Sequence, residues 1–179
     1  FLPIQSIALA VTTFVGQNLG AGNVSRAKKG IYCSYAMATI VSVVLIVPIM
    51  LFSGDVAKIF NSNPDIVAHA SLLLKYMTPF YLFSCVNQVF AAAMRGAGNS
   101  TAPMLIMLGC FIGVRQIYLY VVSTFVTNEF LPIAFSYPVG WAACTVAILF
   151  YYFVFFRFDN NKLLDANKNN SAENAPEQK

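Results

Sequence analysis

The sequence has 179 residues, of which 58% are apolar and 15% aromatic, while only 10% are charged. A soluble domain carries about 25% charged residues, so this composition excludes a single soluble globular domain and is typical of a membrane protein. The formal net charge of +4 is small and its residues are scattered, so nucleic acid is not an expected partner. The first residue, Phe1, already lies in an apolar run, and we therefore expect a piece of a longer protein.

Five apolar runs are long enough to cross a bilayer, because about 20 apolar residues in a helix span its hydrocarbon core. Every backbone amide in lipid needs a partner within the chain, so the sequence predicts an all-α membrane protein. The predicted spans are residues 1–20, 31–53, 72–94, 101–126 and 131–156, which together form a transmembrane region over residues 1–157. Residues 158–179 are rich in Asn, Lys, Glu and Ser, and we predict that this tail is disordered.

Basic residues alternate between the connections of these spans. Arg26, Lys28 and Lys29 lie in the first connection and Arg95 in the third, whereas the second and fourth are neutral or acidic in balance. Basic connections face the cytoplasm in most membrane proteins. The sequence therefore predicts that the first and third connections and the tail are cytoplasmic.

The second connection, residues 54–71, contains the start signal of a helix. Asn63 precedes Pro64, and Asp65 follows in what would be the first turn. We predict a short amphipathic helix here, on the outer face of the membrane.

Two connections share the letters Gly-Ala-Gly-Asn, at residues 20–23 and 96–99. Small residues allow close approach and tight turning of the backbone, and Asn is a favoured cap of a following helix. The sequence predicts two similar turns, with Asn23 and Asn99 as caps.

Both turns, and a third motif, resemble the multidrug and toxic compound extrusion (MATE) family. The stretch Phe14-Val-Gly-Gln-Asn-Leu-Gly-Ala-Gly-Asn23 resembles the first inner turn of its C-terminal lobe, and Met94-Arg-Gly-Ala-Gly-Asn-Ser-Thr101 resembles the second. Tyr137-Pro-Val-Gly-Trp141 is similar to its final-helix motif. The resemblance implies five helices of one six-helix lobe in a twelve-helix transporter of the cell membrane. Such a protein exports organic cations or other drugs in exchange for protons or sodium ions, and the N-terminal lobe of the same chain and membrane lipid would be its partners.

Polar side chains within the spans are the candidate substrate-binding residues, because an unpaired polar group in lipid is costly. Tyr81, Ser84, Asn87 and Gln88 recur at three- and four-residue spacing, so they share one face of the third span. Arg115 is the ionisable residue within the fourth span. For the stripe, the alternative role is hydrogen bonding between helices. For Arg115, the alternatives are capping of carbonyl groups or snorkelling to the outer interface.

No Asp or Glu lies inside any predicted span. We therefore expect no cofactor and no metal site here, and we expect that the site of a coupling proton or sodium ion lies outside this chain. No pairing of a nucleophile with a base is evident, so an enzyme is not expected. Two further functions stay open: a lipid-linked oligosaccharide flippase of the same superfamily, and a membrane scaffold without transport activity.

Overall fold

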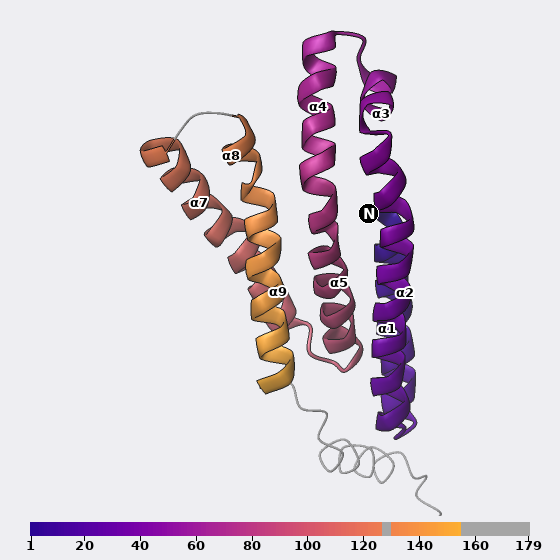
Figure 1. Cartoon of the computed structure of the whole chain (residues 1–179). Helices are drawn as coiled ribbons and strands as arrows, with labels where there is room; N and C mark the ends of the chain where they lie inside the picture. Colours follow the sequence, from indigo (N-terminus) through magenta and orange to yellow (C-terminus); the bar gives the residue numbers. More distant parts are fainter. Residues whose placement is uncertain (127–129, 155–179) are drawn as a thin grey trace, which may run out of the picture.

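A computed structural model describes residues 1–126 and 130–154, and within these ranges the chain is helical, without a strand. The predicted tail and the last residues of the fifth predicted span lie outside the described residues. The helices pack side by side as a bundle (Figure 1). Their bounds are α1 Leu2–Gly20, α2 Val24–Leu51, α3 Ser53–Phe60, α4 Pro64–Met77, η1 Thr78–Phe80, α5 Tyr81–Gly96, α6 Thr101–Leu108, η2 Gly109–Val114, α7 Arg115–Val121, η3 Val122–Val126, α8 Phe130–Ala134 and α9 Ser136–Val154.

Four helical runs are long and apolar enough to cross a membrane: residues 24–51, 64–96, 101–125 and 132–154. They overlap four of the five predicted spans, although two of them begin seven or eight residues earlier, and the protein is a multi-pass membrane protein. The remaining predicted span, residues 1–20, forms the 19-residue helix α1, which is not one of these four. Helix α1 carries the polar residues Gln5, Gln17 and Asn18 and packs against α2 and α5.

Two predicted connections are helical instead. Helix α2 begins at Val24, so Arg26, Lys28 and Lys29 lie in its first turns. The predicted short outer helix is wrong as a separate piece, because α4 continues through the 3-10 turn η1 into α5. Its predicted start is correct: the side chain of Asn63 accepts a hydrogen bond from the Asp65 backbone N–H at 3.0 Å.

Helices α1 and α5 each end in a turn of the same type. The N–H of Gly22 donates to the Leu19 carbonyl at 2.9 Å and that of Asn23 to the Asn18 carbonyl at 2.7 Å. The second turn repeats both bonds, from Gly98 to Arg95 and from Asn99 to Met94, each at 3.0 Å. This is the Schellman arrangement, in which a left-handed residue reverses the chain after the helix.

Glycine is required at one position of each turn, because φ is 73° at Gly22 and 87° at Gly98. Asn99 lies one residue before Ser100, the N-cap of α6, and its Oδ1 accepts a hydrogen bond from the Ala102 N–H in the first turn at 3.2 Å. The capping prediction is wrong for Asn23, whose side chain makes no capping bond to α2.

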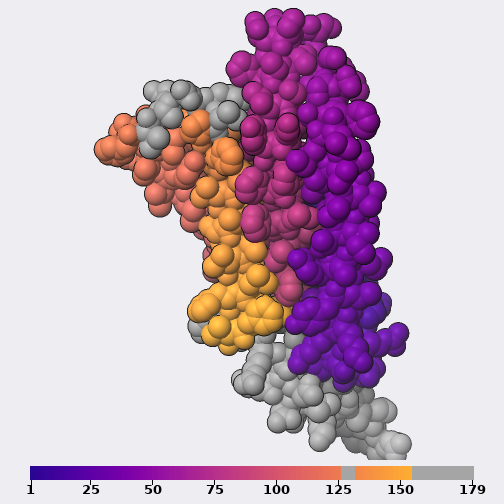
Figure 2. Space-filling model, viewed as in Figure 1, coloured from indigo at the N-terminus to yellow at the C-terminus, as the bar shows by residue number. Residues whose placement is uncertain are grey.

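Small residues bring α1 and α5 into close contact. A Cβ added at Gly96 would lie 2.5 Å from the Thr12 carbonyl oxygen, so the two backbones nearly touch there. One turn away, the Thr12 hydroxyl donates to the Ala92 carbonyl at 3.2 Å. Helix α9 packs on another side of α5, as the space-filling view shows (Figure 2). Helix α5 is therefore the centre of the bundle and presents separate faces to α1 and α9.

Candidate binding cavity

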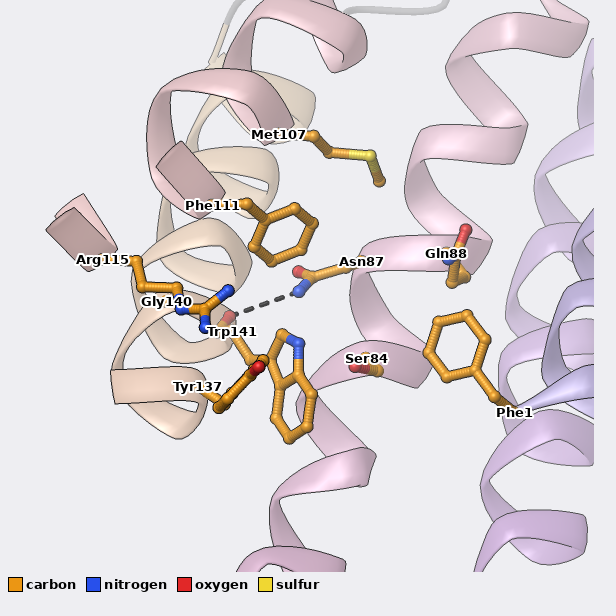
Figure 3. Close-up of a pocket in the computed structure, with 10 residues that line it drawn as sticks. All are labelled: Phe1, Ser84, Asn87, Gln88, Met107, Phe111, Arg115, Tyr137, Gly140 and Trp141. Atoms are coloured by element: carbon orange, nitrogen blue, oxygen red, sulfur yellow. Dashed lines mark hydrogen bonds between the residues drawn. The ribbon is translucent and has the colours of Figure 1, made fainter. Parts of the chain in front are cut away.

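A cavity of about 270 Å³ lies between α5, η2, α7 and α9, next to the start of α1 (Figure 3). Polar and aromatic side chains line it together. The lining residues are Phe1, Ser84, Asn87, Gln88, Met107, Phe111, Arg115, Tyr137, Gly140 and Trp141. Four of the five residues predicted from the sequence meet here, although substrate binding by them remains a prediction.

Helix α5 contributes Ser84, Asn87 and Gln88, which share a face because they are three and four residues apart. Ser84 and Asn87 are buried and Gln88 is half-buried. The hydroxyl of Ser84 and the amide of Gln88 make no hydrogen bond to any other residue that the structure describes. Both groups are therefore available to a molecule in the cavity.

Asn87 is different, because both ends of its amide are occupied. Its Nδ2 donates to the Trp141 carbonyl at 3.2 Å, and its Oδ1 accepts from the Thr145 hydroxyl at 3.0 Å. The side chain is only 2% exposed. Of the two roles that the sequence left open for Asn87, the structure shows the bond between helices, here joining α5 to α9.

Arg115 begins α7, between the two π-helical segments η2 and η3. Such wide turns interrupt a helix and occur often at functional sites. The guanidinium carbon of Arg115 lies 3.8 Å from the centre of the Tyr137 ring, a cation–π contact. Its Nε is buried and has no hydrogen-bond partner among the described residues. Arg115 thus lines the cavity and does not simply extend along the lipid face (Figure 3).

Tyr81 is the predicted site residue that lies outside this cavity. Its ring packs on Trp141, with centroids 5.0 Å apart, and it lines a second, mainly apolar hollow of about 250 Å³ beside α1, α2 and α4. Tyr81 is the first residue of α5 and immediately follows the 3-10 turn η1.

The aromatic side of the cavity was not among the site residues predicted from the sequence. Phe111 in η2 and Arg115 in α7 are four residues apart on one helical run, as are Tyr137 and Trp141 on α9, and all four line the cavity. The Tyr137–Trp141 motif contained this signal, but it served only for the resemblance. Gly140 completes the wall, since a Cβ there would lie 3.8 Å from the Cys110 carbonyl oxygen and 3.9 Å from the Arg115 Cβ.

No carboxylate lines the cavity in the part of the chain that the structure describes, where the acidic residues are Asp55 in α3 and Asp65 in α4. The same part contains no group of three His, Cys, Asp or Glu side chains that could hold a metal ion. A site for a coupling ion therefore stays a prediction, placed outside this chain.

Membrane-length helices surround a cavity with polar and aromatic walls, so the chain is a multi-pass membrane protein with a candidate small-molecule site. The chain belongs to the MatE family, whose sequence profile matches residues 1–121. It is similar over 95% of its length to a solved structure described as the inward-facing conformation of a multidrug resistance MATE family transporter of the MOP superfamily. The TM-score is 0.76 at 19% identity, and 38% of that chain is covered, so this likeness shows the fold alone.

Curated bacterial proteins are also similar. The probable multidrug resistance protein YoeA of Bacillus subtilis (strain 168) is 28% identical over 84% of this chain and 33% of its own length. The probable multidrug resistance protein NorM of Thermotoga maritima is 31% identical over 59% of this chain and 23% of its own. The multidrug resistance protein MdtK of Yersinia pseudotuberculosis is 24% identical over 83% of this chain and 34% of its own. The chain thus spans between 23% and 34% of the length of these relatives.

Proposed function

We propose that this chain is most of the C-terminal lobe of a secondary-active multidrug efflux transporter of the cell membrane, with a cytoplasmic tail. The full-length protein would exchange organic cations or other drugs for protons or sodium ions. The observation that carries the proposal is the cavity, in which aromatic rings from η2 and α9 face unbonded polar groups from α5. The multidrug resistance names of the similar proteins support the same function.

The cavity has the chemistry that amphipathic drugs require. Rings such as those of Phe111 and Trp141 offer stacking faces to an aromatic compound. Ser84 and Gln88 offer hydrogen bonds that fix orientation, a combination that is typical of small-molecule sites. At about 270 Å³ the cavity has room for one aromatic portion of a drug, and the remainder would contact the other lobe.

Coupling to an ion needs a group that changes its charge or its ligands during transport. The described cavity has no carboxylate, so we place the coupling group in the part of the protein outside this chain. Two bundles that rock around a site near the bilayer midplane are a common plan of secondary transporters. The N-terminal lobe and the surrounding lipid are the partners that this proposal requires.

The proposal is tested with the full-length protein in inside-out vesicles. Uptake of a fluorescent organic cation is followed under an imposed proton gradient and then under a sodium gradient, with empty vesicles as control. Uptake driven by one gradient supports the exporter and identifies its coupling ion. No uptake under either gradient, with folded protein verified in the membrane, would overturn the exporter and favour the flippase.

A further inference from the structure

We infer that the basic end of α2 binds the phosphate headgroup of an anionic phospholipid, whose acyl chains lie along an exposed apolar face of the same helix. Figure 1 shows α2 at one edge of the bundle. The inference goes beyond the proposed transport function and does not depend on it. It starts from a single helix face that carries two exposed cations at one end and an unbroken apolar stripe above them.

The first turns of α2 are basic and contain no acidic residue. Arg26 and Lys29 are exposed and three residues apart, so they lie on the same face. Cations are unfavourable at the start of a helix, where the helix dipole already places positive charge. The described carboxylates, those of Asp55 in α3 and Asp65 in α4, belong to helices that follow the opposite end of α2. An anion beside Arg26 and Lys29 would relieve this repulsion.

A hollow of about 430 Å³ adjoins these two cations. It lies between the first turn of α2 and the glycine turn that precedes the helix, and Ser25, Arg26 and Lys29 are among its lining residues. A guanidinium forms strong charge-assisted hydrogen bonds with phosphate oxygens, and an ammonium adds a mobile point charge. No acidic residue is among the described residues that line the hollow. Its chemistry therefore matches a phosphate group.

The face that carries the two cations continues as an apolar stripe along α2. Its members are all exposed and follow one another at steps of three or four residues: Arg26, Lys29, Cys33, Met37, Ile40, Val44, Val47 and Leu51. From Cys33 to Leu51 the stripe is about 27 Å long at 1.5 Å per residue, close to the thickness of the hydrocarbon core. The two cations thus lie at one edge of a lipid-facing stripe, at the level of headgroups.

Tyr32 supports this level. It is 50% exposed and follows Lys29 by three residues, and tyrosine is enriched where membrane meets water. One leaflet contributes about 15 Å of hydrocarbon, or about ten residues of helix, so its acyl chains would extend from Cys33 to about Val44. A soluble phosphate compound would fill the hollow and leave the stripe uncovered. A phospholipid is the occupant that matches both parts of the face.

The test measures lipid binding to purified full-length protein in detergent by native mass spectrometry. Dioleoyl phosphatidylglycerol and dioleoyl phosphatidylcholine have the same acyl chains, but only the first has a net negative charge. We expect the first bound phosphatidylglycerol to bind at least about tenfold more tightly than phosphatidylcholine, as a charge-assisted hydrogen bond would give. The double variant Arg26→Gln/Lys29→Gln should abolish this preference and leave the affinity for phosphatidylcholine unchanged.

Lys58→Gln/Lys75→Gln is the matched control, because it removes two exposed cations from α3 and α4. It should keep the preference in full. Arg26→Lys/Lys29→Arg retains both charges and should keep most of the preference. If the neutral variant of α2 does not fold, the salt dependence of the unmodified protein decides: added salt should reduce the preference, because it screens exposed charges. A preference that salt leaves unchanged would contradict the inference.

Equal affinities of the two lipids for the unmodified protein would overturn the inference. It would also fail if the neutral variant of α2 kept the preference, or if the control pair lost it to the same extent. Glycerol 3-phosphate in large excess separates a lipid from a soluble phosphate compound. It should displace little of the bound phosphatidylglycerol, whereas full displacement would assign the hollow to a soluble phosphate and overturn the lipid as its occupant.

Discussion

Asn87 of α5 and Thr145 of α9 share a buried hydrogen bond of 3.0 Å, beside the cavity whose wall the two helices form. The Thr145 hydroxyl also approaches the carbonyl groups of Trp141, at 2.8 Å, and of Phe83, at 3.3 Å. The bond between Asn87 and Thr145 thus fixes the spacing of α5 and α9. Neighbouring residues of one polar stripe therefore differ in role: Asn87 holds two helices together, while Gln88 is free to meet a ligand.

Asn87→Ala should reduce stability because it leaves buried partners on α9 without the amide. The loss should be about 1–3 kcal/mol in the free energy of unfolding, measured by chemical denaturation in mixed micelles. Gln88→Ala is the control, since its amide makes no bond to another described residue. Equal stability of Asn87→Ala and the native protein would contradict the structural role.

Gly96→Ala should also destabilise the protein. Its Cβ would lie 2.5 Å from the Thr12 carbonyl oxygen, and a backbone atom cannot move away as a flexible side chain can. We expect a loss of about 1–3 kcal/mol, the usual cost of overpacking, in the same denaturation experiment.

Gly20→Ala is the matched control for this change, because Gly20 holds the corresponding position in the first turn. Apart from its chain neighbours and the backbone of its own helix, no atom of the described residues lies within 4 Å of a Cβ at Gly20. The variant should therefore be as stable as the native protein, or slightly more so, since Ala favours helix over Gly. A similar loss in both variants would show that the turn, and not the contact between α1 and α5, determines the effect.

Gly98→Ala tests the left-handed residue of the second turn. With φ at 87°, an L side chain meets a steric cost of about 1–2 kcal/mol, although a Cβ here would have open space around it. Gly98→Asn should lose less, because Asn tolerates this conformation better. The thermal unfolding midpoint should be highest for the native protein, lower for Gly98→Asn and lowest for Gly98→Ala. A midpoint of Gly98→Ala equal to that of the native protein would contradict the turn geometry.

Sequence patterns predicted the parts of the fold that depend on local physics. Apolar length placed the spans of α2, α5, α6–α7 and α9, and the pairing of Asn63 with Pro64 located the start of α4. The patterns missed what packing decides. The predicted outer helix after Asn63 and the predicted span from residue 72 form one helical run, because the 3-10 turn η1 joins α4 to α5.

The same division applies to the cavity. Helical spacing correctly grouped Ser84, Asn87 and Gln88, since i, i+3 and i+4 positions share a face. Spacing could not reveal that the Thr145 hydroxyl donates a hydrogen bond to the Asn87 amide, or that the Tyr137 ring lies against the Arg115 guanidinium. Both contacts join segments that are distant in sequence. Spacing also included Tyr81, whereas its ring packs on Trp141 and lines the second hollow.

The central claim is that the cavity beside α5 contacts the transported compound. Gln88→Ala removes a glutamine side chain that lines the cavity. Gln116→Ala removes a glutamine side chain from an exposed position on α7 and is the matched control. Initial rates of gradient-driven dye uptake, at matched amounts of folded full-length protein, test the claim most directly. Gln88→Ala should raise the dye concentration for half-maximal uptake about threefold to tenfold, the worth of one hydrogen bond, while Gln116→Ala should leave it unchanged. Unchanged uptake in both variants, or an equal loss in both, would contradict the account.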